Sequence, residues 1–207
     1  MDNKVEVKIT LLGDPGVGKT CIINRFTEDK FIQKGSTKGA QYSNKNLKIR
    51  NNLVKMDIWD TAGQEQYRAL GRNFYRDSFI VLLVYDITNK NSFENLEKIW
   101  YPDLKEYGEE YKVLAVVGTK SDLYENEEVL EEEARNYAKE KDAIFMLVSA
   151  KNGNNINVLF NELADKYLEK TFKKVEEIEN IKEDPSKMKL NNNLKRRGSF
   201  FKSKKCC

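Results

Sequence analysis

Cysteine, long apolar runs and an apolar N-terminal segment are scarce or missing in this 207-residue sequence. The three cysteines are Cys21, Cys206 and Cys207, and they cannot supply the framework of a disulfide-stabilised domain. No apolar run approaches the length of a membrane-spanning helix. The first residues, Met1-Asp2-Asn3-Lys4, lack the core of a signal peptide. We therefore expect a soluble protein of a reducing, cytosolic compartment.

Charge is distributed unevenly along the chain. Hydrophobic residues make up 40% and charged residues 33%, and the length suits one domain with a tail. The net charge is +3, but from Pro185 onward there are eight basic residues and no acidic ones. Removing those eight positive charges leaves −5 on residues 1–184. The sequence predicts an acidic body and a basic tail.

The strongest motif fits G-x-x-x-x-G-K-[ST] and reads Gly13-Asp14-Pro15-Gly16-Val17-Gly18-Lys19-Thr20. A strand-like apolar run at residues 5–12 precedes it, and helix-like residues follow. Glycines let backbone N–H groups surround a polyphosphate, while the Lys19 ammonium and the Thr20 hydroxyl complement phosphate and Mg²⁺. Pro15 removes one N–H donor from the loop. The motif predicts a nucleoside triphosphate site, and a glycine-rich turn that merely precedes a helix is the alternative.

Strand-like and helix-like segments alternate along the chain. Expected strands lie at residues 5–12, 42–49, 53–59, 79–85, 113–118 and 143–148, with a hairpin turn at Asn51-Asn52. Expected helices run from the phosphate loop to about residue 26, over residues 67–75, 92–107 and 127–141, and after Gly153. Ser92 is the predicted N-cap of the helix at 92–107, and Pro102 is expected to kink or interrupt that helix. Right-handed crossovers then give an α/β fold, a doubly wound, mostly parallel six-stranded sheet with helices on both faces.

Three further motifs follow predicted strands, at the sheet edge where such folds bind ligands. They are Trp59-Asp60-Thr61-Ala62-Gly63-Gln64-Glu65, Thr119-Lys120-Ser121-Asp122 and Ser149-Ala150-Lys151. With the phosphate loop, their order and spacing over residues 5–172 resemble the Ras-like small GTPases. Segments 58–65, 74–76 and 83–88 and the terminal Cys206-Cys207 look most like the Rab family. The resemblance implies a GTP-binding G domain over residues 1–172 and a disordered basic tail over residues 173–207.

The resemblance also implies a role for each matching residue. Gln64 would be the catalytic residue that orients the attacking water, and Asp122 would select guanine by accepting from its N1–H and 2-amino group. Mg²⁺ would be held by Thr20 and Thr37, and by Asp60 through water. Residues implied to contact GTP or GDP are Asp14, Pro15, Gly16, Val17, Gly18, Lys19, Thr20, Cys21, Phe31, Thr37, Gly63, Thr119, Lys120, Asp122, Leu123, Ser149, Ala150 and Lys151.

Simpler interpretations remain for four of these residues. Asp122 is also a suitable helix N-cap, and Gln64 is also an ordinary solvated loop residue. Thr37 is also an ordinary turn residue, and Phe31 a packing residue that closes the first helix.

Four departures from the family pattern affect these predictions. The family usually has Asn at Thr119, although the Rho branch also uses Thr. Thr37 follows Phe31 by six residues where seven are usual. The loop between them, which is the first switch of the family, is therefore one residue short. Lys38 stands where a branched apolar residue is common. Residues 99–104 resemble the corresponding Rho helix, but the 27-residue step from Asp122 to Ser149 leaves no room for the extra Rho helix.

The tail predicts membrane attachment. Paired terminal cysteines in a Rab-like chain imply two geranylgeranyl groups at Cys206 and Cys207, and nearby basic residues favour anionic lipid. A solvated arm or a nucleic-acid-binding arm is the alternative, although we expect no nucleic acid. The implied partners are an exchange factor, a GTPase-activating protein, an escort protein or dissociation inhibitor, and effectors at the cytoplasmic face of an intracellular membrane. A non-cycling membrane scaffold and an ATP-specific P-loop enzyme are the alternative functions.

Overall fold

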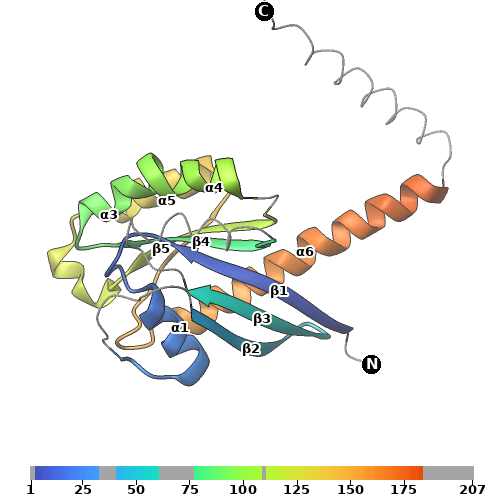
Figure 1. Cartoon of the computed structure of the whole chain (residues 1–207), viewed down its shortest axis with the longest axis horizontal. Coiled ribbons are helices and arrows are strands. Elements are labelled where there is room, and N and C mark those ends of the chain that lie inside the picture. Colours follow the sequence, from blue (N-terminus) through green and yellow to red (C-terminus); the bar gives the residue numbers. More distant parts are fainter. Residues whose placement is uncertain (1–2, 33–40, 61–76, 109–110, 184–207) are drawn as a thin grey trace, which may run out of the picture. The chain divides into compact units, whose positions relative to one another are not determined.

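The computed structural model describes residues 3–32, 41–60, 77–108 and 111–183 (Figure 1). The six strands are β1 (Asn3–Leu12), β2 (Gln41–Ile49), β3 (Asn52–Asp60), β4 (Ile80–Asp86), β5 (Val113–Thr119) and β6 (Ile144–Leu147). The helical elements are α1 (Lys19–Glu28), α3 (Lys90–Asn95), η2 (Leu96–Trp100), α4 (Tyr101–Tyr107), η3 (Ser121–Asn126), α5 (Glu131–Glu140) and α6 (Ile156–Glu183). None of the described helices combines the length and the apolar character needed to span a bilayer.

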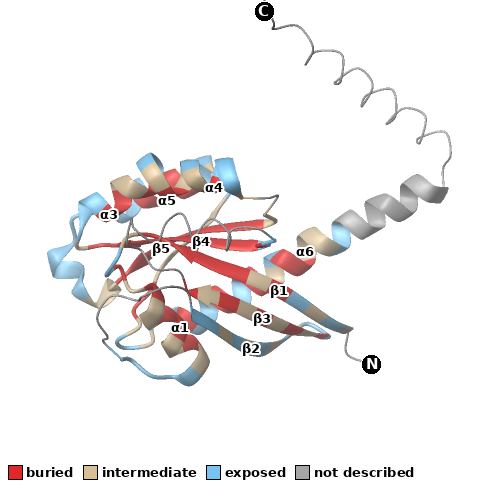
Figure 2. Ribbon diagram, viewed as in Figure 1, coloured by how far each residue is buried: buried red, intermediate tan, exposed pale blue. Residues whose placement is uncertain are grey.

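The strands form one sheet in the order β2-β3-β1-β4-β5-β6. Only the β2–β3 pair is antiparallel, and the pairs β1–β3, β1–β4, β4–β5 and β5–β6 are parallel. Every residue of β4 and β5 is buried (Figure 2), because helices cover both faces of the sheet there and the strands are accordingly apolar throughout. The predicted six-stranded, mostly parallel α/β fold is confirmed.

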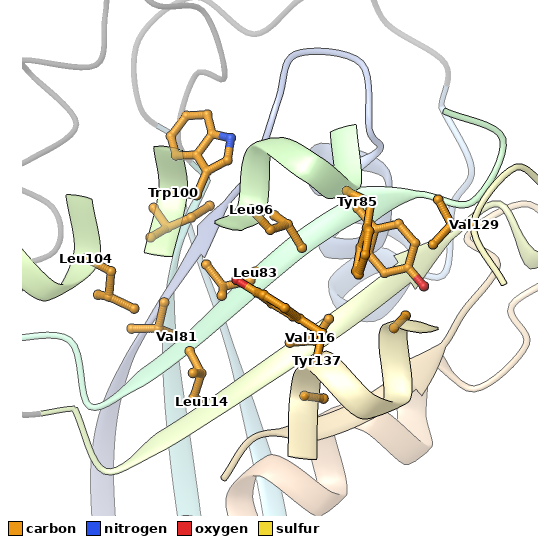
Figure 3. Packing of buried hydrophobic residues seen from close by; sticks show 14 of the residues in the cluster. Val81, Leu83, Tyr85, Leu96, Trp100, Leu104, Leu114, Val116, Val129 and Tyr137 are labelled. Atoms are coloured by element: carbon orange, nitrogen blue, oxygen red, sulfur yellow. The ribbon is translucent and has the colours of Figure 1, made fainter. Parts of the chain in front are cut away.

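Two helical layers cover the sheet (Figure 1). The elements α3, η2, α4 and α5 pack on one face in a cluster that includes Tyr85, Leu96 and Trp100 (Figure 3). On the other face, the rings of Phe26 in α1 and Phe160 in α6 stack with their centroids 3.7 Å apart. The four predicted motifs begin at the carboxyl ends of β1, β3, β5 and β6.

The helix predicted at residues 92–107 begins earlier than expected. Its N-cap is Asn89, whose side chain accepts a hydrogen bond from the Ser92 N–H, so the assignment of Ser92 as the cap is wrong. Ser92 is fully buried, and its hydroxyl accepts from the Asp86 N–H at 3.0 Å. Asn89 is as good a cap as Ser, and burial commits the Ser92 hydroxyl to the end of β4.

The interruption expected at Pro102 lies just before it, where a π-helical turn separates two α-helical segments. In η2 the hydrogen bonds reach back five residues, as from the Tyr101 N–H to the Leu96 carbonyl. The α-helical pattern then restarts at α4, with Pro102 in its first turn. A proline is tolerated in a first turn because its missing N–H is not needed there.

Three other boundaries differ from the predictions. Residues 121–126 form the separate 3₁₀ helix η3, so α5 begins at Glu131 and not at residue 127. Asn52 belongs to β3 and pairs with Ile49, which places the hairpin turn at Arg50-Asn51. Helix α6 continues to Glu183, so residues 173–183 are helical and not disordered as predicted. The helix predicted at residues 67–75 lies outside the described residues.

Candidate nucleotide site

The predicted phosphate loop connects β1 to α1 and depends on glycine at three positions. Gly13, Gly16 and Gly18 have φ angles of 151°, 79° and 101°, which L side chains rarely adopt. A Cβ atom at Gly13 would lie 2.1 Å from the Val84 carbonyl oxygen, so the loop can cross β4 only without a side chain there. The glycine spacing thus sets the path of the loop.

Lys19 lies under this loop with only 5% of its surface exposed. Its Nζ donates to the carbonyl oxygens of Gly13 at 2.6 Å and Asp14 at 2.8 Å. Burial lowers the pKa of Lys19 to about 8, against the opposing effect of the nearby Asp60 and Asp14 carboxylates. The site therefore holds a desolvated ammonium group that an anion would stabilise.

Thr20 and Asp60 come together from the first turn of α1 and the end of β3. The Thr20 hydroxyl donates to Asp60 Oδ2 at 2.5 Å, while the buried Oδ1 atom of Asp60 has no hydrogen-bond partner among the residues that the structure describes. Burial raises the pKa of Asp60, and the Thr20 hydrogen bond and Lys19 oppose that shift. A hydroxyl beside an incompletely satisfied carboxylate fits a hard cation such as Mg²⁺, which prefers oxygen ligands.

No group of three or more His, Cys, Asp or Glu side chains that could hold a metal occurs among the described residues. Mg²⁺ usually keeps several waters and is bound by one or two protein groups together with substrate phosphates. The Thr20–Asp60 pair fits that pattern without a larger cluster of protein ligands.

The second predicted motif begins at the end of β5. The Thr119 hydroxyl lies 2.5 Å from the Val17 carbonyl oxygen and 3.0 Å from that of Tyr85. Thr119 thereby connects the phosphate loop to the strand ends without the longer Asn side chain usual in the family. Lys120 Nζ pairs with Asp86 Oδ2 at 2.5 Å.

The third predicted motif meets the second at Asp122. The Ser149 hydroxyl donates to Asp122 Oδ1 at 2.6 Å, and Lys151 Nζ lies 3.6 Å from Asp122 Oδ2. Asp122 is held by a residue 27 positions away, and it lies inside η3, whose N-cap is Lys120, so it is not the cap of that helix. The two motifs form one polar surface that can present a carboxylate to a base.

The other predicted residues lie around this centre or outside the described residues. Phe31 is 41% exposed and Leu123 37% exposed. Cys21 is half-buried in α1, and its Sγ donates to the Ile32 carbonyl oxygen at 3.6 Å. Five predicted positions lie outside the described residues and stay predictions: Thr37, Gly63, Gln64, Cys206 and Cys207.

The structure also brings four residues to the site that the sequence analysis did not select. Arg25 donates to the Ala150 carbonyl oxygen at 2.7 Å and to that of Lys151 at 3.0 Å. Asp86 holds Lys120, and the Asp14 carboxylate accepts hydrogen bonds from two side chains of the α3–η2 segment, Asn95 and Trp100. No local pattern marks these residues, because their partners lie far away in the sequence.

Comparison with known proteins identifies the family. The Ras family profile matches residues 8–169. Human Ras-related protein Rab-22A is 46% identical over 160 residues, which covers 77% of this chain and 82% of that protein. Rice Ras-related protein Rab5A is 40% identical over 169 residues, 81% of this chain and 83% of that protein. Arabidopsis thaliana RABF2a is 37% identical over 207 residues, 100% of this chain and 97% of that protein.

The matched region spans the phosphate loop, the Thr20–Asp60 pair and both loops around Asp122. Proteins of this family bind guanine nucleotides and act with regulators and effectors, and vesicle trafficking is the general role of Rab proteins. The chain belongs to the Ras family and is a Rab-like small GTPase, an enzyme that hydrolyses GTP.

Proposed function

We propose that this GTPase is a Mg²⁺-dependent GTP/GDP switch that acts on a membrane of the vesicle-trafficking system. One observation supports the proposal most strongly: the buried Lys19 ammonium, held by two loop carbonyls, lies in the same site as the Thr20–Asp60 pair. A desolvated cation beside backbone N–H groups and a hard-cation ligand pair is suited to a nucleotide polyphosphate.

In this proposal different residues bind different parts of the nucleotide. Gly16, Val17 and Gly18 surround the phosphates with backbone N–H groups, and Lys19 contributes its charge. Asp122, oriented by Ser149, accepts hydrogen bonds from the guanine edge. Adenine does not present that pair of donors, so selectivity for guanine depends on Asp122.

Thr20 and Thr37 would hold Mg²⁺ directly, and Asp60 would hold it through water. When bound, the ion neutralises charge on the phosphate oxygens. Gln64 would orient the attacking water, which requires positioning and no covalent chemistry. We expect intrinsic turnover on the order of 10⁻⁴ to 10⁻³ s⁻¹, because the matched sequence motifs offer no obvious arginine that would act in cis. A GTPase-activating protein would then accelerate hydrolysis.

The tail would provide the membrane attachment. Two prenyl groups at Cys206 and Cys207 would anchor the chain stably where one is marginal, and the eight basic residues after Pro185 would favour an anionic leaflet. Cycling between membrane and cytosol would require an escort protein or dissociation inhibitor. An exchange factor would load GTP, and effectors would bind the GTP state at the cytoplasmic face.

The test is to identify by mass spectrometry the nucleotide that purified protein carries, and to follow it during incubation with excess GTP and Mg²⁺. Bound GDP and slow GTP conversion that stops when Mg²⁺ is chelated would support the switch. Gln64→Leu should slow single-turnover hydrolysis without releasing the nucleotide. GTP that stays bound and unconverted would reject the GTP/GDP switch in favour of the non-cycling scaffold. The scaffold is considered because the loop between Phe31 and Thr37 is one residue shorter than usual.

A further inference from the structure

Two side chains outside the predicted motifs hold the carboxylate of Asp14 in the phosphate loop. Asn95 Nδ2 donates to Asp14 Oδ2 at 2.6 Å, and Trp100 Nε1 donates to Asp14 Oδ1 at 2.7 Å. Each oxygen of the carboxylate thus has its own donor. We name these three residues, Asp14, Asn95 and Trp100, the Asp14 clamp.

The position of Asp14 in the loop gives the clamp its importance. The backbone carbonyl of Asp14 is one of the two acceptors that hold Lys19 Nζ, at 2.8 Å. The next residue, Pro15, has a fixed φ and no N–H, so it gives the loop no backbone donor of its own at this point. Through its side chain, Asp14 is therefore attached to residues outside the loop. These contacts hold in place the loop backbone that orients Lys19.

The donors come from the most irregular part of the helical layer. Asn95 ends α3, and Trp100 ends the π-helical turn η2. Trp100 is only 4% exposed and lies at the edge of the apolar cluster (Figure 3). A π turn changes the direction of the side chains that follow it, and such turns are frequent at functional sites. The ring is buried in this cluster, and its N–H donates to the Asp14 carboxylate.

We infer that Asn95 and Trp100 are positioning residues for nucleotide binding, which act through Asp14 without contacting the nucleotide. The inference rests on the proposed phosphate site. According to this inference, the α3–η2 segment controls how long GDP stays bound. Anything that moves this segment would change the GDP dissociation rate through the clamp.

The test measures dissociation of a fluorescent GDP analogue from the full chain after mixing with excess GDP. Trp100→Phe keeps an aromatic ring in the cluster but removes the donor, and we expect about tenfold faster dissociation, the usual effect of one hydrogen bond to a charged group. Asp14→Ala should accelerate release at least as much. The double variant should be no faster than Asp14→Ala, because both changes remove the same bond.

Phe93→Leu is the matched control, since Phe93 is a buried aromatic residue of the same cluster with edge-on ring contacts to Tyr85 and Tyr137. It should lower the melting temperature and leave the dissociation rate within about twofold of wild type, given that it removes packing but no donor. Wild-type rates for Trp100→Phe, or multiplied rates in the double variant, would overturn the inference.

A spectroscopic readout covers the case in which Trp100→Phe does not fold. The chain has two tryptophans, so Trp59→Phe leaves Trp100 as the single reporter. Its emission should shift when GDP is removed, and the shift should disappear when Asp14→Ala is added; a shift that persists contradicts the clamp.

Asn95→Ala provides a second dissociation test. If wild-type protein bound no guanine nucleotide, the proposed function would fail, whereas GDP binding with clamp-independent release would reject only this inference.

Discussion

The candidate site has two sides: a phosphate side formed by the loop around Lys19, and a base side formed by the loops around Asp122 and Ser149. The two sides hold their lysines in different ways. Lys19 is buried and its ammonium donates to backbone carbonyls. Lys120 and Lys151 have side chains 38% and 64% exposed, and each is paired with a carboxylate, that of Asp86 and Asp122 respectively. In the proposed function, the phosphate side would offer a desolvated charge to an anion. The base side, whose lysines are already paired with carboxylates, would depend on the direction of hydrogen bonds.

The largest effect that tests this contrast is expected for Lys19→Met. It removes the desolvated charge, and we expect the affinity for GDP and GTP to fall by roughly 10³-fold, since several charge-assisted hydrogen bonds are lost at once. The nucleotide-free protein should remain as stable as wild type, because replacing a buried charge with an apolar chain removes a desolvation cost. Equilibrium titration and thermal unfolding measure the two quantities.

Lys151→Met is the control for this variant, because it removes an exposed lysine on the base side. Exposed ion pairs contribute little, so the affinity for GDP should change less than about threefold. A loss as large as that of Lys19→Met would show that the two sides use charge in the same way.

A smaller and more selective effect is expected for Asp122→Ala. It should weaken GDP binding by about 100-fold and leave the weak binding of ADP unchanged, because hydrogen bonds to a charged acceptor are lost only for guanine. The measurement is the ratio of GDP to ADP affinities. Thr119→Val is the matched control: it removes the hydroxyl near the Val17 and Tyr85 carbonyls and should weaken both nucleotides equally. Preserved selectivity in Asp122→Ala would favour the ATP-specific alternative.

The smallest effect is a pH dependence that arises on the phosphate side alone. The pKa of Lys19 is lowered to about 8 by burial, and bound phosphates would favour its charged form again. Binding should therefore take up a proton above pH 8, so that GDP affinity falls by up to roughly tenfold between pH 8 and 9 and is insensitive to this group below pH 7. Titrations across this range should show the decrease in wild type, and Lys19→Met should give a flat profile.

The same shift has the opposite sign for folding. The folded pKa of Lys19 is below its ordinary value of 10.5, so between pH 8 and 10.5 the unfolded chain binds more protons than the folded one. In that window this group makes the nucleotide-free protein more stable as the pH rises. If the melting temperature decreased more steeply with rising pH for wild type than for Lys19→Met, that result would contradict the description of Lys19 as a buried charge.

Local patterns predicted the fold well where one kind of interaction dominates. The apolar runs of β4 and β5 could only be covered strands, and G-x-x-x-x-G-K-[ST] placed the phosphate loop between β1 and α1. Prediction failed where neighbouring residues compete for the same role. Asn89 and Ser92 are both good caps, and only the burial of Ser92 against the end of β4 decides between them. At Pro102 the sequence predicted a kink or an interruption but not its form, because a π turn has no simple sequence signature.

By itself, the sequence determined the family, the order of the strands and helices, and the types of groups that gather in the candidate nucleotide site. These follow from short-range spacing, because glycine conformations, apolar periodicity and contiguous motifs are encoded within a few residues. The tertiary structure alone decided which distant groups hold those motifs in place. Asn95 and Trp100 reach Asp14 across 81 and 86 positions, and Arg25 reaches Ala150 across 125. Such partners are selected by the packing of helices on the sheet, which leaves no local pattern in the sequence.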